Sequence, residues 1–251
     1  MTTPAPRRMA AKTIADDLRT QIKAGALSPG DVLPTSRELA ESYGVTLKTV
    51  NAGIDLLKVE GLVIGEQGGR RRVRANRPIV WNLTRFERGS RRDSAAGDDW
   101  STGIRDAGRE PEQHVTVHTA QAGPEVAAWL QVPAGSDVVQ RVRLRTVDGQ
   151  PYQLATSSFP MSIAKGTPLM DQGDVSMPGG ILASIGHPQL HVRDEITIRM
   201  PSPEESKQLQ LPPGTPVAEH VRIGYGEAGP VRVMVTIAPG DRHRLVYEMD
   251  V

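Results

Sequence analysis

Arginines at alternate positions form the first group of residues whose type and spacing could do chemistry. In "QRVRLR", a strand would place Arg141, Arg143 and Arg145 on one face, because successive side chains point to opposite sides. A planar guanidinium can donate to two oxygens of a phosphate or carboxylate at once. On the pattern alone, the ordinary interpretation is that three arginines cover a solvated strand, although their geometry would also suit a small anion.

A second group of cations lies in the first third of the chain and suits a larger polyanion. "GGRRRV" places Arg70, Arg71 and Arg72 directly after a glycine turn. Residues 1–78 hold 13 Lys and Arg against 8 Asp and Glu, whereas residues 79–251 hold 17 against 21. Arginines that neutralise DNA phosphates release counterions, and a basic front on an acidic back suggests two domains.

Several classes of protein are not favoured by the sequence. The chain has 251 residues, which is enough for two ordinary domains, and it has no cysteine for disulfides, thiolate chemistry or a Cys-based zinc site. No apolar run reaches a bilayer span, and the N-terminus has no signal-peptide core. We found no P-loop, nucleophile elbow or dinucleotide fingerprint. A cytoplasmic protein without a membrane partner, metal or other cofactor is expected.

The first 74 residues predict three helices followed by a β-hairpin. Ile14, Leu18 and Ile22 have helical spacing, and Gly25 is expected to end that helix. Thr35 and Glu38 have the spacing of a capping box for a second helix, which Gly44 ends. Thr46 is expected to cap a third helix that ends at Gly61. Strands are expected at 62–64 and 71–74, so the layout is that of a winged helix-turn-helix.

The rest of the chain predicts a linker and a second domain of the α+β class. Residues 75–100 lack periodicity and are expected to be a linker that opens with a short strand at 79–83. Residues 101–251 alternate strand-like runs with short helices, and hairpin turns are expected at "DG" (148–149) and "EAG" (227–229). A domain built on an antiparallel sheet follows from this pattern.

Both halves resemble one family. "LSPGDVLPTSRELAESYGVTLKTVNAGIDLLKVEGLV" is similar to the DNA-binding head of the GntR family of bacterial transcription regulators. "AAWLQVPAGSDVVQRVRLRTVDGQPYQLATSSFP", "GTPL" and "RMPSPEESKQLQLPPGTPVAEHVR" resemble the UTRA effector domain of its HutC-type branch. The resemblance implies a chorismate-lyase-like fold for residues 101–251. It also implies a homodimer that binds a near-palindromic double-stranded DNA operator under control of a small molecule.

The resemblance also assigns residues to DNA. By similarity, Arg37 starts the second helix and contacts a phosphate or a base. The first turn of the recognition helix holds Thr46, Lys48 and Thr49. The tip of the wing is formed by Gln67 and Gly68. Many relatives carry arginine where this chain has Leu47 and Asn51. Asn51 could bond an adenine edge, and Leu47 could touch a thymine methyl. The wing arginines could restore the lost phosphate affinity. The candidate DNA-binding residues are Arg37, Thr46, Leu47, Lys48, Thr49, Asn51, Gln67, Gly68, Arg70, Arg71 and Arg72.

For the effector, the resemblance assigns the first two arginines of the alternating run to a phosphate or carboxylate. Ala155 and Ser158 replace a glutamate and a tyrosine of relatives that bind amino-sugar phosphates, which favours a less hydroxylated ligand. Nearby hydroxyls could partly substitute for those groups, and a "DR" pair near the C-terminus could be either a ligand contact or a turn ion pair. The candidate effector-binding residues are Arg141, Arg143, Thr156, Ser158, Asp241 and Arg242.

The sequence therefore predicts a homodimeric DNA-binding regulator, most simply a repressor, that responds to an effector for which an anion is one candidate chemistry. One rival is a constitutive repressor or plasmid-control protein whose effector pocket is vestigial. A second rival is an enzyme of the lyase-like fold that carries a DNA-binding head, although a shared fold does not imply a shared function.

Overall fold

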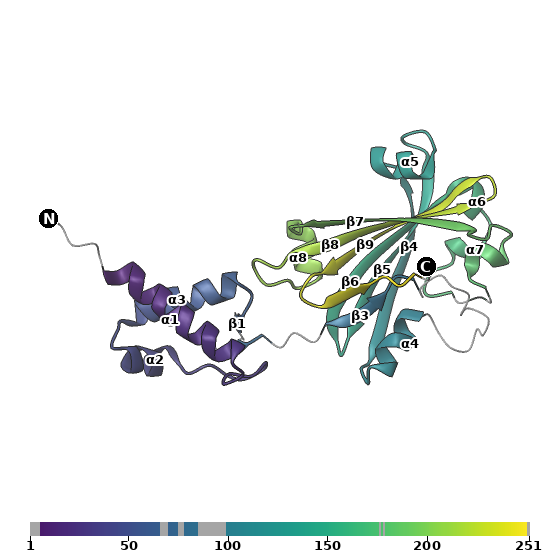
Figure 1. Ribbon diagram of the computed structural model, residues 1–251. Helices are drawn as coiled ribbons and strands as arrows, with labels where there is room; N and C mark the ends of the chain where they lie inside the picture. The colour runs from purple at the N-terminus through teal and green to yellow at the C-terminus, as the bar shows by residue number, and fades with distance from the viewer. Residues whose placement is uncertain are drawn as a thin grey trace. The chain divides into compact units, whose positions relative to one another are not determined.

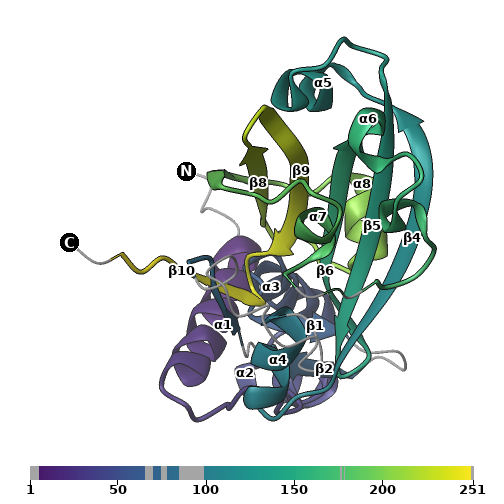
Figure 2. The ribbon, with the colours of Figure 1, turned by 90° about the vertical axis from the view of Figure 1, so that its right-hand side faces the viewer.

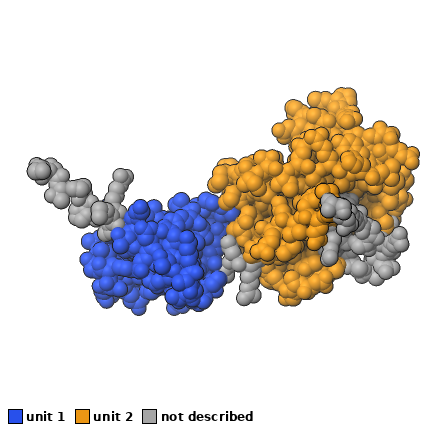
Figure 3. Space-filling view, in the orientation of Figure 1, with its two compact units in different colours: residues 1–77, 211–215 blue, residues 78–210, 216–251 orange. Residues whose placement is uncertain are grey.

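The computed structural model describes residues 6–65, 70–74, 78–84, 99–175, 177 and 179–249. The chain forms two compact units, which are coloured separately in Figure 3. The first unit holds residues 1–77 and 211–215, and the second holds residues 78–210 and 216–251. No helix in the described part of the chain combines the length and the apolar character that crossing a bilayer requires.

The first unit contains the three predicted helices and the predicted hairpin. Its elements are α1 (Pro6–Lys23), α2 (Ser36–Tyr43), α3 (Leu47–Val59), β1 (Val63–Gly65) and β2 (Arg71–Val73). The two strands pair antiparallel, with Val63 opposite Val73. The winged helix-turn-helix layout is confirmed, and the first strand of the hairpin begins one residue later than expected.

Local capping explains where α2 and α3 begin and end. The Thr35 hydroxyl accepts from the Glu38 backbone N–H, and the Glu38 carboxylate accepts from the Thr35 N–H, which is the predicted capping box. Gly44 ends α2 in the left-handed conformation at φ 63°, which costs glycine little. The Thr46 side chain caps α3. These signals fix a short turn between the two helices.

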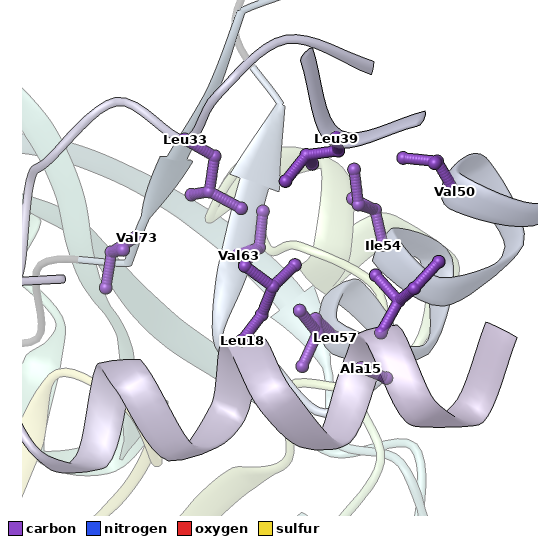
Figure 4. Packing of buried hydrophobic residues seen from close by; sticks show 10 residues of the cluster. Ala15, Leu18, Leu33, Leu39, Val50, Ile54, Leu57, Val63 and Val73 are labelled. Atoms are coloured by element: carbon purple, nitrogen blue, oxygen red, sulfur yellow. The ribbon is translucent and has the colours of Figure 1, made fainter. Parts of the chain in front are cut away.

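A single apolar core joins α1, α3 and the hairpin. Leu18 of α1 and Leu57 of α3 belong to one cluster with Val63 and Val73 of the two strands, and Figure 4 shows Leu18 and Leu57 close to Val63. The two helices approach closely at Gly53 of α3, where an added Cβ would lie 2.8 Å from the carbonyl oxygen of Ala11. Only glycine fits at that distance, so α1 packs against the backbone of α3.

The second unit is built on a six-stranded antiparallel sheet, which is visible in Figures 1 and 2. The order of the strands is β4-β5-β6-β9-β8-β7. Their bounds are β4 Pro111–Gln121, β5 Asp137–Val147, β6 Gln150–Pro160, β7 His191–Arg199, β8 Val217–Gly226 and β9 Gly229–Pro239. The α+β class predicted from the sequence is confirmed.

Two tight hairpins set the centre of the sheet. Asp148 and Gly149 have φ values of 51° and 73° between β5 and β6, which is the pattern of a two-residue hairpin turn. The turn between β8 and β9 follows Gly226, which pairs with Gly229. Both predicted turns are confirmed.

Short helices cover both faces of the sheet. Their bounds are α4 Asp99–Asp106, α5 Pro124–Leu130, α6 Met161–Ala164, the 3-10 helix η2 Pro168–Met170, α7 Ile181–Ser184 and α8 Pro203–Gln208. One apolar cluster joins Val117, Val139 and Phe159 to Leu169 of η2 and Leu182 of α7. Another joins Leu130 of α5 to Val138 and other residues of the opposite face. The two faces therefore have different surroundings.

A two-stranded parallel ribbon packs on the sheet. It consists of β3 (Ile79–Asn82) and β10 (His243–Val246). Trp81 packs with Ala218 of β8 and Ala238 of β9. The strand expected at 79–83 is therefore confirmed, but its partner lies far along the chain and was not predicted.

The close contact at Gly53 generates a prediction about stability. Gly53→Ala should lower the free energy of unfolding, because overpacking costs about 1–3 kcal/mol and outweighs the helix propensity of alanine, about 1 kcal/mol. Gly103→Ala in α4 is the matched control, since its new methyl group would meet nothing within 4 Å. That control should be neutral or stabilising in chemical denaturation. Equal effects of both substitutions would refute the tight packing.

Candidate nucleic-acid interface and anion site

The solvent-facing side of α3 carries most of the side chains expected to read bases. Val50, Ile54 and Leu57 are buried against the core, whereas Lys48 and Asn51 are exposed on the other side of the helix. Leu47, in the first turn, is 51% exposed, which is unusual for a large apolar residue. This face is available to a partner and combines an ammonium group, an amide and an apolar tip.

The two threonines of the first turn have a different role. The Thr46 hydroxyl accepts from the Thr49 backbone N–H, and the two hydroxyl oxygens lie 3.0 Å apart. Thr49 is only 7% exposed. Its side chain is committed to the cap and the interior, so the expected direct contact of Thr49 with DNA is not available in this structure.

Asn51 belongs to a closed ring of hydrogen bonds that joins α3, α2 and the hairpin. The Ser36 hydroxyl donates to Asn51 Oδ1 at 2.9 Å, and Arg71 Nη2 donates to the same oxygen at 3.0 Å. Arg71 Nη1 donates to Ser36 Oγ at 2.5 Å. Because a carbonyl oxygen has two lone pairs, the Asn51 oxygen is saturated. The expected pairing of Asn51 with adenine needs this oxygen as an acceptor, and in this arrangement both of its lone pairs are in use.

The three wing arginines are not equivalent. Arg70 is exposed, Arg71 takes part in the ring with Asn51, and Arg72 Nη1 donates to the carbonyl of Gly30 at 3.0 Å. The expected wing-tip residues Gln67 and Gly68 lie outside the described residues. Arg37, at the start of α2, is exposed like Arg70. Arg37, Lys48 and Arg70 are thus the predicted cations with exposed side chains.

In the second unit, the alternating arginines lie on the sheet face that α6, η2 and α7 cover. Arg141 pairs with Ser157 of β6, and Arg143 pairs with Ala155. Arg141 is fully buried and donates to the carbonyls of Leu169, Asp171 and Gly173 at 2.7 to 3.0 Å. Its guanidinium therefore holds the segment around η2, and burial lowers its pKa.

Arg143 has a different environment from its neighbours. No hydrogen bond or salt bridge joins its guanidinium to a residue in the described part of the chain. Burial, and then repulsion from Arg145, Arg141 and Arg232, lowers the pKa of Arg143 to about 10, against the attraction of Asp174. A cation with this combination of burial and like charges is stabilised by an added anion.

Thr156 and Ser158 do not lie on the face of the sheet that carries Arg141 and Arg143. They alternate with Ala155 and Ser157 along β6, so they point to the opposite face of the sheet. Ser158 Oγ accepts there from Gln140 Nε2 at 3.2 Å. The predicted effector set is therefore split between two faces. The hydroxyls that share the arginine face are those of Ser157 and of Thr236, which pairs with Ala155 from β9.

Asp241 and Arg242 form part of the framework. Arg242 Nη1 donates to the carbonyls of Pro151 and Leu209, and Arg242 Nη2 donates to that of Gln210 at 3.3 Å. Arg242 Nε and the Asp241 carboxylate are 3.8 Å apart. These bonds support the alternative interpretation of the pair as a structural contact, since Arg242 is committed to three carbonyls.

The sequence analysis missed a buried charged network. Asp194 of β7 accepts from Arg222 at 2.6 Å and lies 2.9 Å from His220 Nε2. Burial alone would raise the pKa of Asp194, but hydrogen bonds from Arg222 and His220 hold it well below its usual range. Nothing in the sequence marks these residues, because they come together only through the register of β7 with β8. Among the described residues, no His, Asp and Glu cluster could hold a metal ion.

Comparisons with known proteins agree with both halves of this arrangement. Residues 10–73 match the bacterial regulatory proteins of the gntR family, and residues 106–244 match the UTRA domain. An HTH-type transcriptional regulator of Streptomyces coelicolor is 31% identical over 257 residues, covering 98% of this chain and 95% of that protein. The HTH-type transcriptional repressor NagR of Bacillus subtilis is 26% identical, covering 94% and 93%.

Solved structures give the same result. A GntR-family transcriptional regulator of known crystal structure superposes with a TM-score of 0.64 at 26% identity, over 96% of this chain and 98% of that one. PhnF from Mycobacterium smegmatis superposes with a TM-score of 0.58 at 22% identity, over 95% and 99%. The second likeness concerns the fold alone.

The contrast between paired and unpaired arginines generates a prediction. Arg143→Met should raise the melting temperature of the ligand-free protein, because it removes a poorly solvated charge from beside three like charges. Arg222→Met should destabilise by about 3–5 kcal/mol, because it removes the arginine that neutralises the buried Asp194 carboxylate and leaves only His220 beside it among the described residues. Thermal and urea unfolding measure both effects. A destabilised Arg143→Met protein would show that this arginine is part of the framework.

Proposed function

Because the chain belongs to the gntR family of bacterial regulatory proteins and carries a UTRA domain, we propose that this transcription regulator is a repressor that binds a near-palindromic operator as a homodimer and responds to a small anion. It acts where bacterial DNA is, in the cytoplasm. The observation that carries the DNA-binding part is the exposed face of α3, with Lys48 and Asn51 on it.

The chemistry of this face suits the major groove. An α-helix fits the groove, where donors and acceptors on the base edges distinguish all four base pairs. Asn51 can reach an edge, and Leu47 can contact the methyl group of thymine. Exposed cations on either side, Arg37 of α2 and Arg70 beside β2, suit the phosphates that set the orientation of the helix.

A homodimer follows from the small size of the reading face. One short helix with a few exposed residues contacts only a few base pairs, which is too little sequence to identify one operator. Two copies related by a two-fold axis read an inverted repeat and double that information. The relative NagR is a repressor, which supports the sign of regulation proposed for this chain.

The effector site is proposed at Arg143. Its guanidinium lacks a bonded partner in the described part of the chain, and like charges surround it. A phosphate or carboxylate would relieve both. Ala155, which pairs with Arg143 from β6, adds no polar group to that site, but the hydroxyls of Ser157 and Thr236 lie on the same face and could contact the ligand.

One observation favours a rival. Arg141, the second arginine expected to hold an anion, is occupied by three backbone carbonyls. A regulator whose effector domain has lost its ligand would have such a framework, and it would repress constitutively. Ligand binding decides between these two proposals.

DNA binding predicts a change in salt dependence. Arg37→Ala, Lys48→Ala and Arg70→Ala should each weaken binding to all duplexes. Each should also reduce the steepness of the slope of log affinity against log salt concentration by about 0.9. Lys165→Ala, at an exposed position of the second unit, is the control and should leave the slope unchanged. Fluorescence anisotropy with a labelled duplex at several salt concentrations measures the slopes. Slopes identical to that of the unmodified chain in all three variants would remove these cations from the interface.

Effector binding predicts a thermal shift that depends on Arg143. Inorganic phosphate, phosphate monoesters and small carboxylates are the probes, and one at 100 times its dissociation constant should stabilise by about 2.7 kcal/mol. Arg143→Met should abolish the shift. Arg193→Met, an exposed arginine paired with Glu195, should retain it. A shift that persists in Arg143→Met would place the ligand elsewhere, and silence of the whole panel would favour the constitutive repressor.

A further inference from the structure

We propose that Ser36, Asn51 and Arg71 form one reading unit that presents only hydrogen-bond donors to the major groove and therefore selects guanine at the base that Asn51 faces. The inference rests on the proposed binding of α3 to DNA, and it names the base that this site reads. It replaces the expected contact of Asn51 with adenine, which needs a donor and an acceptor, by a contact made through donors alone.

The geometry of the ring fixes which atom of Asn51 points outward. Arg71 can only donate hydrogen bonds, so the amide atom that lies 3.0 Å from its Nη2 is the oxygen. The Ser36 hydroxyl accepts from Arg71 Nη1 and donates its own proton to the same oxygen at 2.9 Å. The amide NH₂ of Asn51 takes no part in these bonds and can donate to a group outside the ring.

The saturated oxygen decides the choice of base. Adenine offers an acceptor at N7 and a donor at N6, so asparagine pairs with it only when its own oxygen is available. Guanine offers two acceptors, N7 and O6. The NH₂ of Asn51 and the remaining N–H groups of Arg71 match two acceptors, and they oppose the N6 amino group of adenine and the N4 amino group of cytosine.

The hairpin holds Arg71 in the position that the ring needs. Arg71 pairs with Gly65 across the hairpin, and the Arg71 carbonyl accepts from the Leu33 backbone N–H at 2.8 Å. The strand is therefore bonded on both sides. Arg71 is only partly exposed, whereas Asn51 is exposed on α3. The hairpin thus places the guanidinium of Arg71 beside Asn51 of the recognition helix.

The ring could instead serve only to tie the hairpin to α3. A tie of that kind would affect stability and the affinity for every duplex equally. A reading unit affects the preference between bases at one position. The two roles therefore separate in a measurement of relative affinities.

The experiment begins with duplexes selected from random DNA by the full-length chain. Asn51→Ala identifies the base pair whose preference the amide sets. Affinities for the four base pairs at that position are then measured for the unmodified chain, for Ser36→Ala/Arg71→Met, and for Arg70→Ala. The last variant removes the adjacent charge without touching the ring.

The unmodified chain should prefer guanine over adenine by about tenfold or more, the range of a good bidentate contact. Ser36→Ala/Arg71→Met frees the oxygen of Asn51, so the preference should fall below about threefold or change to adenine. Arg70→Ala should weaken all four duplexes equally and keep the preference for guanine.

Three results would overturn the inference. One is a preference of the unmodified chain for adenine or cytosine at this position. Another is a guanine preference that Ser36→Ala/Arg71→Met retains, with Ser36→Ala alone as the milder variant if the double one unfolds. The third is the absence of any preferred duplex, which would overturn the proposed function together with this inference.

Discussion

The close packing of α1 against the backbone of α3 is the constraint on which the rest of the first unit depends. An added Cβ at Gly53 would lie 2.8 Å from the Ala11 carbonyl, so the rotation of α3 about its own axis has little freedom. That rotation decides which residues face solvent. It exposes Lys48 and Asn51 and turns Thr49 inward. A helix that could roll by one residue would present a different set of groups to DNA.

Arginine has four distinct roles in this chain, and the difference lies in what surrounds each guanidinium. Arg141 and Arg242 donate to backbone carbonyls and hold loops in place. Arg222 is paired with a buried carboxylate. Arg71 saturates the side-chain oxygen of a neighbour and thereby sets which hydrogen-bonding groups that neighbour can offer. Arg143, by contrast, has like charges around it and no bonded partner among the described residues, so its charge is available to a ligand.

The features that the sequence predicted correctly depend on neighbours in the chain. The capping box of Thr35 and Glu38 and the hairpin turn at 148–149 are local, so residue type and spacing were sufficient. The features that it missed depend on pairing between distant strands. Whether Thr156 shares a face with Arg143 depends on the register of β5 with β6, and a shift of one residue exchanges the faces. The ring between Asn51 and Arg71 likewise needs the hairpin to fold back on α3. The elements were therefore predictable from the sequence, whereas the side chains that share one face were not.

The central claim is that the exposed face of α3 lies in the major groove, once for each chain of a pair. Protection of a selected duplex from methylation by dimethyl sulfate tests it directly, because this reagent modifies guanine N7 in the major groove and adenine N3 in the minor groove. The account predicts two patches of protected guanine N7, separated by about one helical turn, 10–10.5 base pairs, or a multiple of it. A single protected patch, or protection confined to adenine N3, would contradict it.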